Sequence, residues 1–349
     1  MTRVPLWDNA RVAIIALVVI GHAIQRQTYD SNNALGVYLA IYAFHMPAFM
    51  LVSGYFSRST PLDTRRMRGI VADLIVPYLI FQTIWTIVQW LVEGADSFNP
   101  TAPKWTLWFL LTLAIFRVAL PYLALVRWPL VWAIAGSVAV GYWGNVDSTF
   151  SLSRTMGILP FFLLGWMLAQ TDLVERWRTA PRSIVVGVRA ASVAVWGAWI
   201  AVVALNIQLF RDMDLRLWFF YDESYRELDT SGPQAAVLRL AIMALAVVLT
   251  AAFLVLVPRR ETVVSHLGRA TIYVYLLHSF VLYPIRESGI LRDEHSSATW
   301  LLAMIAVSLL ITLVLSSAWV QRLFRPLVQP RARWLFRDAE PAASAPGRT

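Results

Sequence analysis

The 349-residue chain has no cysteine and a single lysine, Lys104. Without cysteine it can form no disulfide, no thiol nucleophile and no thiolate metal site. Charged residues make up only 15% of the chain, where a soluble domain of this size carries about a quarter. These shortages argue against a soluble globular protein.

Several sequence signatures are also missing. There is no P-loop, no dinucleotide fingerprint and no G-x-S-x-G, so ATP-driven and serine-hydrolase functions lack support. The histidines in apolar segments have no carboxylate at metal-ligand spacing, and we expect no metal site. The net charge of +9 comes from arginines that gather between apolar segments, which argues against a nucleic-acid partner. We expect no cleaved signal peptide, because the first apolar run has no A-x-A-like exit.

Long apolar runs fill the rest of the chain, which is 58% hydrophobic. Runs of roughly 17 to 25 residues match the length of a helix that spans a bilayer. The pattern predicts an all-α, polytopic transmembrane helical bundle with about ten spans. We place one transmembrane domain over 1–325 and a basic, then disordered, cytoplasmic tail over 326–349. The predicted spans are 10–27, 34–56, 70–92, 105–124, 128–144, 156–171, 184–207, 235–257, 270–287 and 299–319.

Alternate loops carry the arginines, as after spans two, six and eight, whereas the other loops hold most of the acids. The positive-inside rule then places both termini in the cytoplasm. The near-absence of lysine fits a GC-rich bacterial genome, so the inner (plasma) membrane of a bacterium is the expected location.

Arg11 and His22 are the most informative residues of the first span. Eleven residues are about three helical turns, so both side chains lie on one face, roughly 16 Å apart along the axis. Ionisable residues within a membrane helix are costly and usually mark a functional pathway. A neutral His22 can act as general base on a hydroxyl, and Arg11 near the cytoplasmic surface suits phosphate. Alternatively, Arg11 is only a positive-inside anchor.

Two further histidines, His45 and His278, fall within spans two and nine. Pro47 is expected to kink the second span just after His45 and thereby open a cavity. Gly54, after Ser53, is expected to allow the close approach of a neighbouring helix. Ordinary membrane packing explains these features equally well.

The longest predicted outside loop, 208–234, mixes aromatic residues such as Tyr221 with acids. Aromatic faces beside carboxylates suit a sugar, although an interfacial cap on the bundle fits as well. Trp105 and Trp108 lie near a predicted span end, where indole rings favour the membrane interface.

Several blocks of the chain occur in the order typical of one family. They are WDNARVAIIALVVIGHA (7–23), FHMPAFMLVSGYFSR (44–58), VPYLIF (76–81), WTLWFLLTLAIFR (105–117), LPFFLLGWMLA (159–169) and ATIYVYLLHSFVLYP (270–284). With them the chain resembles the acyltransferase 3 family of integral membrane acyltransferases, especially its fucose 4-O-acetylase-like branch. The resemblance runs from residue 7 to about 325.

This resemblance implies transfer of an acyl group, usually acetyl, from cytoplasmic acyl-CoA to a hydroxyl of a carbohydrate or small molecule. The family's catalytic His and its partner Arg correspond to His22 and Arg11, and the His of the second block to His45. We expect acyl-CoA (acetyl-CoA) as donor substrate and no bound cofactor. The CoA phosphates should meet Arg11 with Arg65, Arg66 and Arg68, and the acceptor should contact Trp105, Trp108, Tyr221 and His278. Some relatives carry an esterase domain after the bundle; we expect none here.

Two other functions remain open. A transporter or flippase of a glycan or lipid intermediate would need no chemistry but should show repeated halves, which the sequence lacks. A structural membrane subunit would leave the Arg11–His22 spacing unexplained. The sequence identifies neither the acceptor, nor the acyl chain length, nor the oligomeric state, and it leaves both direct transfer and a covalent acyl-histidine open.

Overall fold

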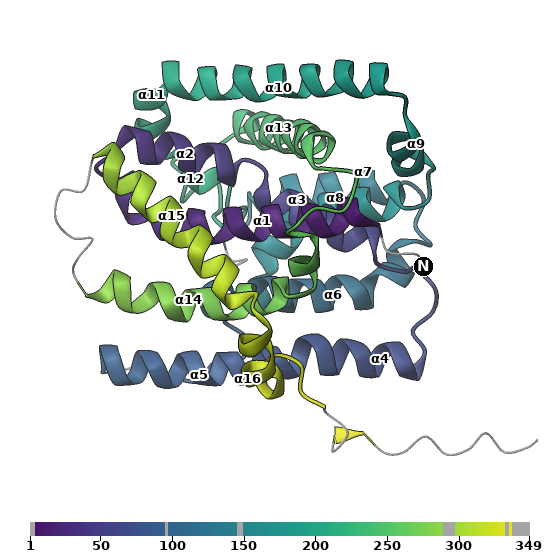
Figure 1. Cartoon of the computed structure of the whole chain (residues 1–349), viewed down its shortest axis with the longest axis vertical. Coiled ribbons are helices and arrows are strands. Elements are labelled where there is room, and N and C mark those ends of the chain that lie inside the picture. The colour runs from purple at the N-terminus through teal and green to yellow at the C-terminus, as the bar shows by residue number, and fades with distance from the viewer. Residues whose placement is uncertain (1–3, 95–96, 145–148, 289–296, 332–334, 337–349) are drawn as a thin grey trace, which may run out of the picture.

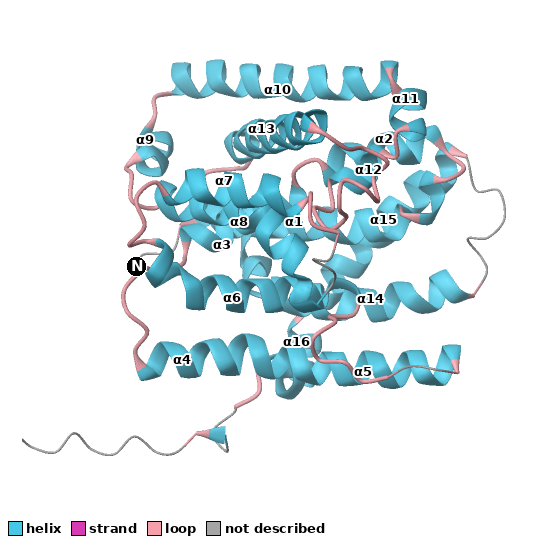
Figure 2. Cartoon of the chain, turned by 180° about the vertical axis from the view of Figure 1, so that it is seen from behind, coloured by secondary structure: helices cyan, strands magenta, loops and turns pink. Residues whose placement is uncertain are grey.

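A computed structural model of the chain describes residues 4–94, 97–144, 149–288, 297–331 and 335–336. Within these ranges the chain forms helices, turns and loops without a strand (Figure 2), which confirms the predicted all-α class. The longer helices lie side by side, most of them along one common direction (Figure 1). The helices are α1 Pro5–Ile24, α2 Asn32–Tyr42, α3 His45–Tyr55, α4 Thr64–Ile70, α5 Val76–Glu93, α6 Trp108–Leu123, α7 Pro129–Val140, α8 Leu152–Leu168, α9 Leu173–Thr179, α10 Arg182–Leu205, α11 Ile207–Asp212, α12 Leu215–Trp218, α13 Pro233–Leu256, α14 Thr271–Glu287, α15 Ala298–Leu315 and α16 Ala318–Val328.

Each of the ten predicted spans contains a helix, and the protein is a multi-pass membrane protein. In the described part of the chain, 8 helical segments are long and apolar enough to cross a membrane. The helices in the fifth and ninth predicted spans, α7 and α14, are shorter, at 12 and 17 residues. The count of ten spans and the cytoplasmic termini stay predictions.

The second predicted span is interrupted, but not where we expected. α2 ends at Tyr42 and α3 begins at His45, so the break precedes His45. The predicted kink after Pro47 is wrong. Pro47 lies in the first turn of α3, where a backbone N–H has no helical acceptor to lose, and proline is tolerated there.

Two other boundaries differ from the prediction. α1 begins at Pro5, five residues before the predicted start, so that Asp8 and Asn9 also lie within the helix. α16 continues to Val328, across the predicted start of the tail at 326. Residues 332–334 and 337–349 of that tail lie outside the described residues, so its predicted disorder stays a prediction.

α1 runs through the middle of the bundle, and α10 lies at its edge (Figure 1). Close contacts at three glycines determine how α2 packs on α1 and how α3 packs on α8. A Cβ at Gly21 would lie 2.7 Å from the ring of Tyr42 in α2. Where α3 crosses α8, a Cβ at Gly54 would overlap the carbonyl oxygen of Phe162, and one at Gly165 that of Leu51. The two glycines therefore allow the backbones of α3 and α8 to come into contact, as expected for Gly54.

The beginnings of α1, α4 and α10 lie on one side of the bundle, which we call the N-terminal side (Figure 1). Asn9 ties α1 to the 258–265 loop there. Its amide nitrogen donates to the carbonyls of Pro258 (2.9 Å) and Arg260 (3.0 Å), and its amide oxygen accepts from Thr262 and Ser265 (2.8 and 2.6 Å). All its hydrogen-bonding capacity is used, so the start of α1 is held rigidly.

Candidate active site

The two ends of one face of α1 open into different cavities. His22 lines a cavity of about 310 Å³, which we call the His22 cavity. Arg11 lines a second cavity of about 370 Å³, the Arg11 cavity, on the N-terminal side. Arg11 and His22 thus lie at two different cavities. Because both side chains are on one face of α1, a single helix reaches both cavities.

Three histidines gather around the His22 cavity. His22 and His45 line it, and the ring of His278 lies behind, 5.4 Å from the ring of His22. Tyr42 separates His22 from His45, with ring distances of 6.5 and 4.5 Å. The structure therefore brings together histidines from α1, α3 and α14, although His278, predicted to contact the acceptor, does not itself line the cavity.

Backbone contacts fix the tautomers of two of these rings. The Nδ1 atom of His45 lies 3.0 Å from the carbonyl oxygen of Ile41. The Nδ1 atom of His278 lies 2.9 and 2.8 Å from the carbonyl oxygens of Val274 and Tyr275. A carbonyl only accepts, so we assign the proton to Nδ1 in both rings and leave Nε2 as an acceptor. Nε2 of His278 is buried and has no hydrogen-bond partner among the described residues.

Indole rings and arginines line the same cavity. Trp105 and Trp108, both predicted to bind substrate, form part of its wall. The guanidinium of Arg286 lies 4.7 Å from the Trp105 ring centre and that of Arg154 5.2 Å from the Trp108 ring centre. Arg154 also pairs with Asp222. Neither arginine was among the predicted site residues.

The outer wall of the His22 cavity comes from the 217–223 part of the predicted outside loop. Tyr221, predicted to bind substrate, lines the cavity and is buried. Tyr221 and Trp105 both have left-handed backbone conformations, with φ of 59° and 51°. Such strain in bulky residues needs support from the surroundings and is typical of functional sites.

Arg239 of α13 provides part of that support. Its side chain is 1% exposed, and its guanidinium lies 5.0 Å from the ring centre of Tyr221, 5.5 Å from that of Tyr225 and 6.0 Å from that of Trp218. The sequence reasoning missed Arg239, although an arginine within a predicted span is itself a signal of function.

The carboxyl group of Glu223, like that of Asp222, faces the cavity from this loop segment. Burial, together with the neighbouring charges of Asp222 and Glu227, raises the pKa of the Glu223 carboxyl to about 7. The cavity thus holds an acid that changes charge near neutral pH.

The N-terminal side of the site is cationic. Arg117 of α6 and Asp73 line the Arg11 cavity with Arg11. Arg11 also borders a wider cleft of about 910 Å³, the Arg58 cleft, which Arg58 and Arg178 line together with aromatic rings. Arg11 itself lies 3.8 Å from Asp8 and 4.4 Å above the Phe56 ring. Sequence reasoning missed Arg117 too, although it lies in a predicted span.

The three other arginines predicted to bind CoA lie outside both cavities and the cleft. The guanidinium of Arg66 donates to Arg58, Thr60 and Pro61 and so stabilises its own loop. Arg68 lies 5.4 Å from the Phe336 ring centre, and Arg65 is exposed. This placement does not support their predicted contact with the donor.

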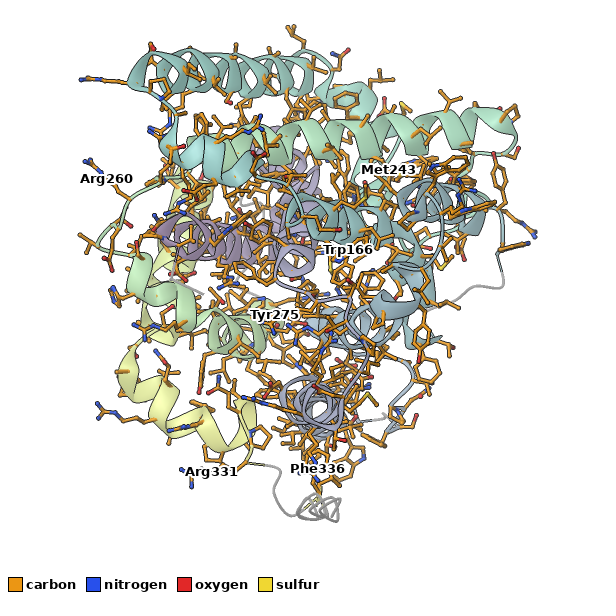
Figure 3. The ribbon with its side chains drawn as sticks, turned by 90° about the vertical axis from the view of Figure 1, so that its right-hand side faces the viewer. Trp166, Met243, Arg260, Tyr275, Arg331 and Phe336 are labelled. Carbon is orange, nitrogen blue, oxygen red and sulfur yellow. The ribbon has the colours of Figure 1, made fainter. Side chains whose placement is uncertain are left out.

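Among the described residues, no group of three or more His, Asp or Glu side chains is arranged to hold a metal ion. Figure 3 looks onto the N-terminal side and shows Tyr275 inside the bundle, while Arg260 and Arg331 lie near its rim.

Comparison with known proteins agrees with this architecture. A family model described as an acyltransferase domain, Acyl_transf_3, matches residues 5–317. Nodulation protein NolL of Mesorhizobium japonicum is 29% identical over 179 residues, which cover 47% of either chain. Its namesake from Sinorhizobium fredii is 28% identical over 183 residues, covering 47% of this chain and 48% of its own.

The chain spans about half the length of the curated relatives that it matches. No solved structure matches it. The resemblance to the fucose 4-O-acetylase-like branch stays a prediction. The family model covers nearly the whole bundle, including both ends of the Arg11–His22 helix, and the chain therefore belongs to the acyltransferase 3 family of membrane proteins.

Proposed function

We propose that the protein transfers an acyl group, acetyl in the first instance, from acyl-CoA to a hydroxyl of a carbohydrate or a small molecule. One observation carries the proposal: Arg11 and His22, at the two ends of one helix face, line two cavities that share a wall. A charged donor and a neutral acceptor would enter from opposite sides and meet there.

The donor is assigned to the N-terminal side. CoA combines phosphates and an adenine ring with a narrow pantetheine arm. The Arg58 cleft offers arginine forks for phosphate and the rings of Tyr55 and Trp166 for the base. Because Arg11 lines both the cleft and the Arg11 cavity, the arm would pass Arg11 and point towards His22.

The acceptor is assigned to the His22 cavity. Its walls combine flat rings, including Trp105 and Trp108, with the polar groups of Glu223 and Arg286. A sugar presents C–H faces to aromatic rings and hydroxyls to charged groups, so it fits both kinds of wall.

In the proposed reaction, neutral His22 removes the proton of the acceptor hydroxyl while the hydroxyl oxygen attacks the thioester carbonyl. A C–O bond forms, the C–S bond breaks, and the protonated imidazole returns its proton to the departing thiolate. The products are the ester and free CoA. The ring separation of 5.4 Å leaves room for the N–H of His22 to donate to Nε2 of His278. His278 is then a positioning residue.

Release of the CoA thiol tests the proposal directly. Because the chain has no cysteine, thiol colorimetry in nanodiscs has no background from the protein. We expect acetyl-CoA and a sugar panel to give ester and thiol in equal amounts. His22→Ala should lower kcat on the order of 10³-fold. The matched control is His266→Ala, since His266 is exposed in the short 3-10 helix Ser265–Arg269.

Full activity of a correctly inserted His22→Ala protein would overturn the role of His22. Movement of a glycan across the membrane without thiol release would favour a transporter instead. A burst of thiol without acceptor would show that the acyl group first binds covalently to the enzyme.

A further inference from the structure

The wall between the His22 cavity and the Arg11 cavity consists of three aromatic residues. Phe49, Phe109 and Tyr275 line both cavities. The ring centres of Phe49 and Phe109 are 4.9 Å apart, and those of Phe109 and Tyr275 are 5.5 Å apart. The three rings come from α3, α6 and α14 and meet as one layer across the route from Arg11 to His22.

The register of α3 shows how this layer divides the path. Met46 lines the His22 cavity, Phe49 lines both cavities, and Ser53 lines the Arg11 cavity. These residues are three and four positions apart, so they share one helix face. Along this face a single ring marks the change from one compartment to the other.

α6 repeats the arrangement. Trp108 lines the His22 cavity, Phe109 lines both, and Leu113 and Arg117 continue along the Arg11 cavity at four-residue steps. Two independent helices therefore place an aromatic ring at the same level, which a chance packing contact does not require.

The three rings are held unequally. The Tyr275 hydroxyl donates to the backbone carbonyl of Thr106, which fixes that ring. Tyr275 and Phe109 are each 6% exposed, whereas Phe49 is only half-buried. The layer has a fixed edge at Tyr275 and a freer edge at Phe49.

We infer that Phe49, Phe109 and Tyr275 form a threading point, through which the acyl end of acyl-CoA reaches His22. The inference rests on the proposed function, because it requires a donor on the Arg11 side and a base on the His22 side. The layer closes the path to water and ions when no donor is bound, and it limits the size of the acyl group that passes. It therefore determines acyl-chain specificity.

Cysteine accessibility tests the barrier without any need for acyl transfer, since the natural chain has no cysteine. Met46→Cys and Ser53→Cys place one thiol on either side of the layer. A charged, membrane-impermeant maleimide is applied to vesicles of each orientation. We expect Ser53→Cys to react only from the N-terminal side and Met46→Cys only from the opposite side. Adding Phe109→Ala should speed labelling from the far side at least tenfold.

Phe116→Ala is the matched control, because Phe116 is buried on the same helix and lines neither cavity. If the alanine variants do not fold, Phe109→Leu and Phe116→Leu form a milder pair. If Met46→Cys and Ser53→Cys, each with Phe109 intact, are both labelled from both sides, the proposed barrier is wrong.

The specificity arm uses acetyl-, butanoyl- and hexanoyl-CoA with the same proteins. Phe109→Ala, unlike Phe116→Ala, should raise the rate with butanoyl-CoA relative to acetyl-CoA at least tenfold. If a Phe109 variant loses the barrier to labelling but keeps the wild-type preference for acetyl-CoA over butanoyl-CoA, the layer does not determine acyl-chain specificity. If Met46→Cys and Ser53→Cys are each labelled from one side but the wild-type protein forms no ester, the barrier stays in place, and the acyl-transfer function is overturned together with the threading role.

Discussion

The two sides of the aromatic layer differ in how they hold charge. In the His22 cavity, Arg154 and Arg286 are balanced by Asp222 and Glu223. Each of these arginines also lies over an indole ring. The charges there are mutually compensated, and the cavity suits a neutral ligand that exchanges hydrogen bonds with them.

On the N-terminal side, four arginines face three carboxyl groups across the Arg11 cavity and the Arg58 cleft. The excess of positive charge lies beside basic loops and close to solvent. Such a surface attracts anions from a distance and holds phosphate oxygens on arrival. The comparison teaches that charge selects the donor on one side, whereas shape and hydrogen bonding select the acceptor on the other.

The largest effect that separates the two sides is expected for Arg11→Gln. This variant loses a hydrogen bond to a charged group, worth about 1.5–3 kcal/mol. The KM for acetyl-CoA should rise roughly 10- to 100-fold, whereas the KM for the acceptor should stay the same. Steady-state kinetics with each substrate varied in turn measures both. Arg65→Gln, which removes an exposed arginine outside both cavities, serves as control. A rise in the acceptor KM instead would remove the distinction between the two sides.

Gly21→Ala tests whether the packing of α1 against α2 beside His22 can accommodate one additional methyl group. The new Cβ would lie 2.7 Å from the Tyr42 ring. Overpacking of this kind costs about 1–3 kcal/mol, so the melting temperature should fall and activity with it. At Gly69 in α4 a Cβ would meet its nearest neighbour, an Asp73 oxygen, at 3.9 Å. Gly69→Ala should therefore be neutral or stabilising. Equal melting temperatures for the two variants would refute the contrast.

Arg239→Met removes the cation that contacts the rings of Trp218, Tyr221 and Tyr225, and it keeps most of the side-chain volume. Replacing a buried charge by an apolar group is often neutral for stability, so we expect little change in melting temperature. The loop that carries Tyr221 should lose its anchor, and the acceptor KM should rise about tenfold as cation–π contacts are lost. An altered acetyl-CoA KM would instead show that α13 supports both sides.

Much of this arrangement follows from local sequence. The spacing of eleven residues from Arg11 to His22 determines a shared helix face, and apolar runs determine helices. The break before His45 was not predicted, because Pro47, the residue that disfavours helix, lies beyond the break in the first turn of α3. A local pattern identifies a residue that disfavours helix but not the place where a helix ends.

The charged groups of the site were predicted less well, for a similar reason. Arg65, Arg66 and Arg68 form a conspicuous basic run, yet they lie outside the cavities. Arg117 and Arg239 are single arginines within apolar segments and lie in or behind the walls. Isolation within a span was the better signal, because an unsolvated guanidinium needs a partner or a cavity.

The smallest expected effect, and the one most specific to the His22 side, is the pH dependence of acceptor use. Burial, with Asp222 and Glu227 nearby, raises the pKa of Glu223 to about 7. A carboxylate accepts stronger hydrogen bonds from a sugar hydroxyl than a neutral carboxyl does. The acceptor KM should therefore fall about threefold as the pH rises through 7, and Glu223→Gln should abolish that change while the acetyl-CoA KM stays flat.

Stability should follow the opposite sign. A carboxyl whose pKa is higher in the folded than in the unfolded protein binds its proton more tightly when folded. Its contribution to the free energy of unfolding therefore declines as the pH rises from about 4.5 to 7. Titration of His22 would change kcat rather than the acceptor KM. Both the acceptor KM and the melting temperature of the wild-type protein are measured against pH. If the acceptor KM is lowest at the pH where the melting temperature is highest, pH acts on the whole bundle and not on Glu223.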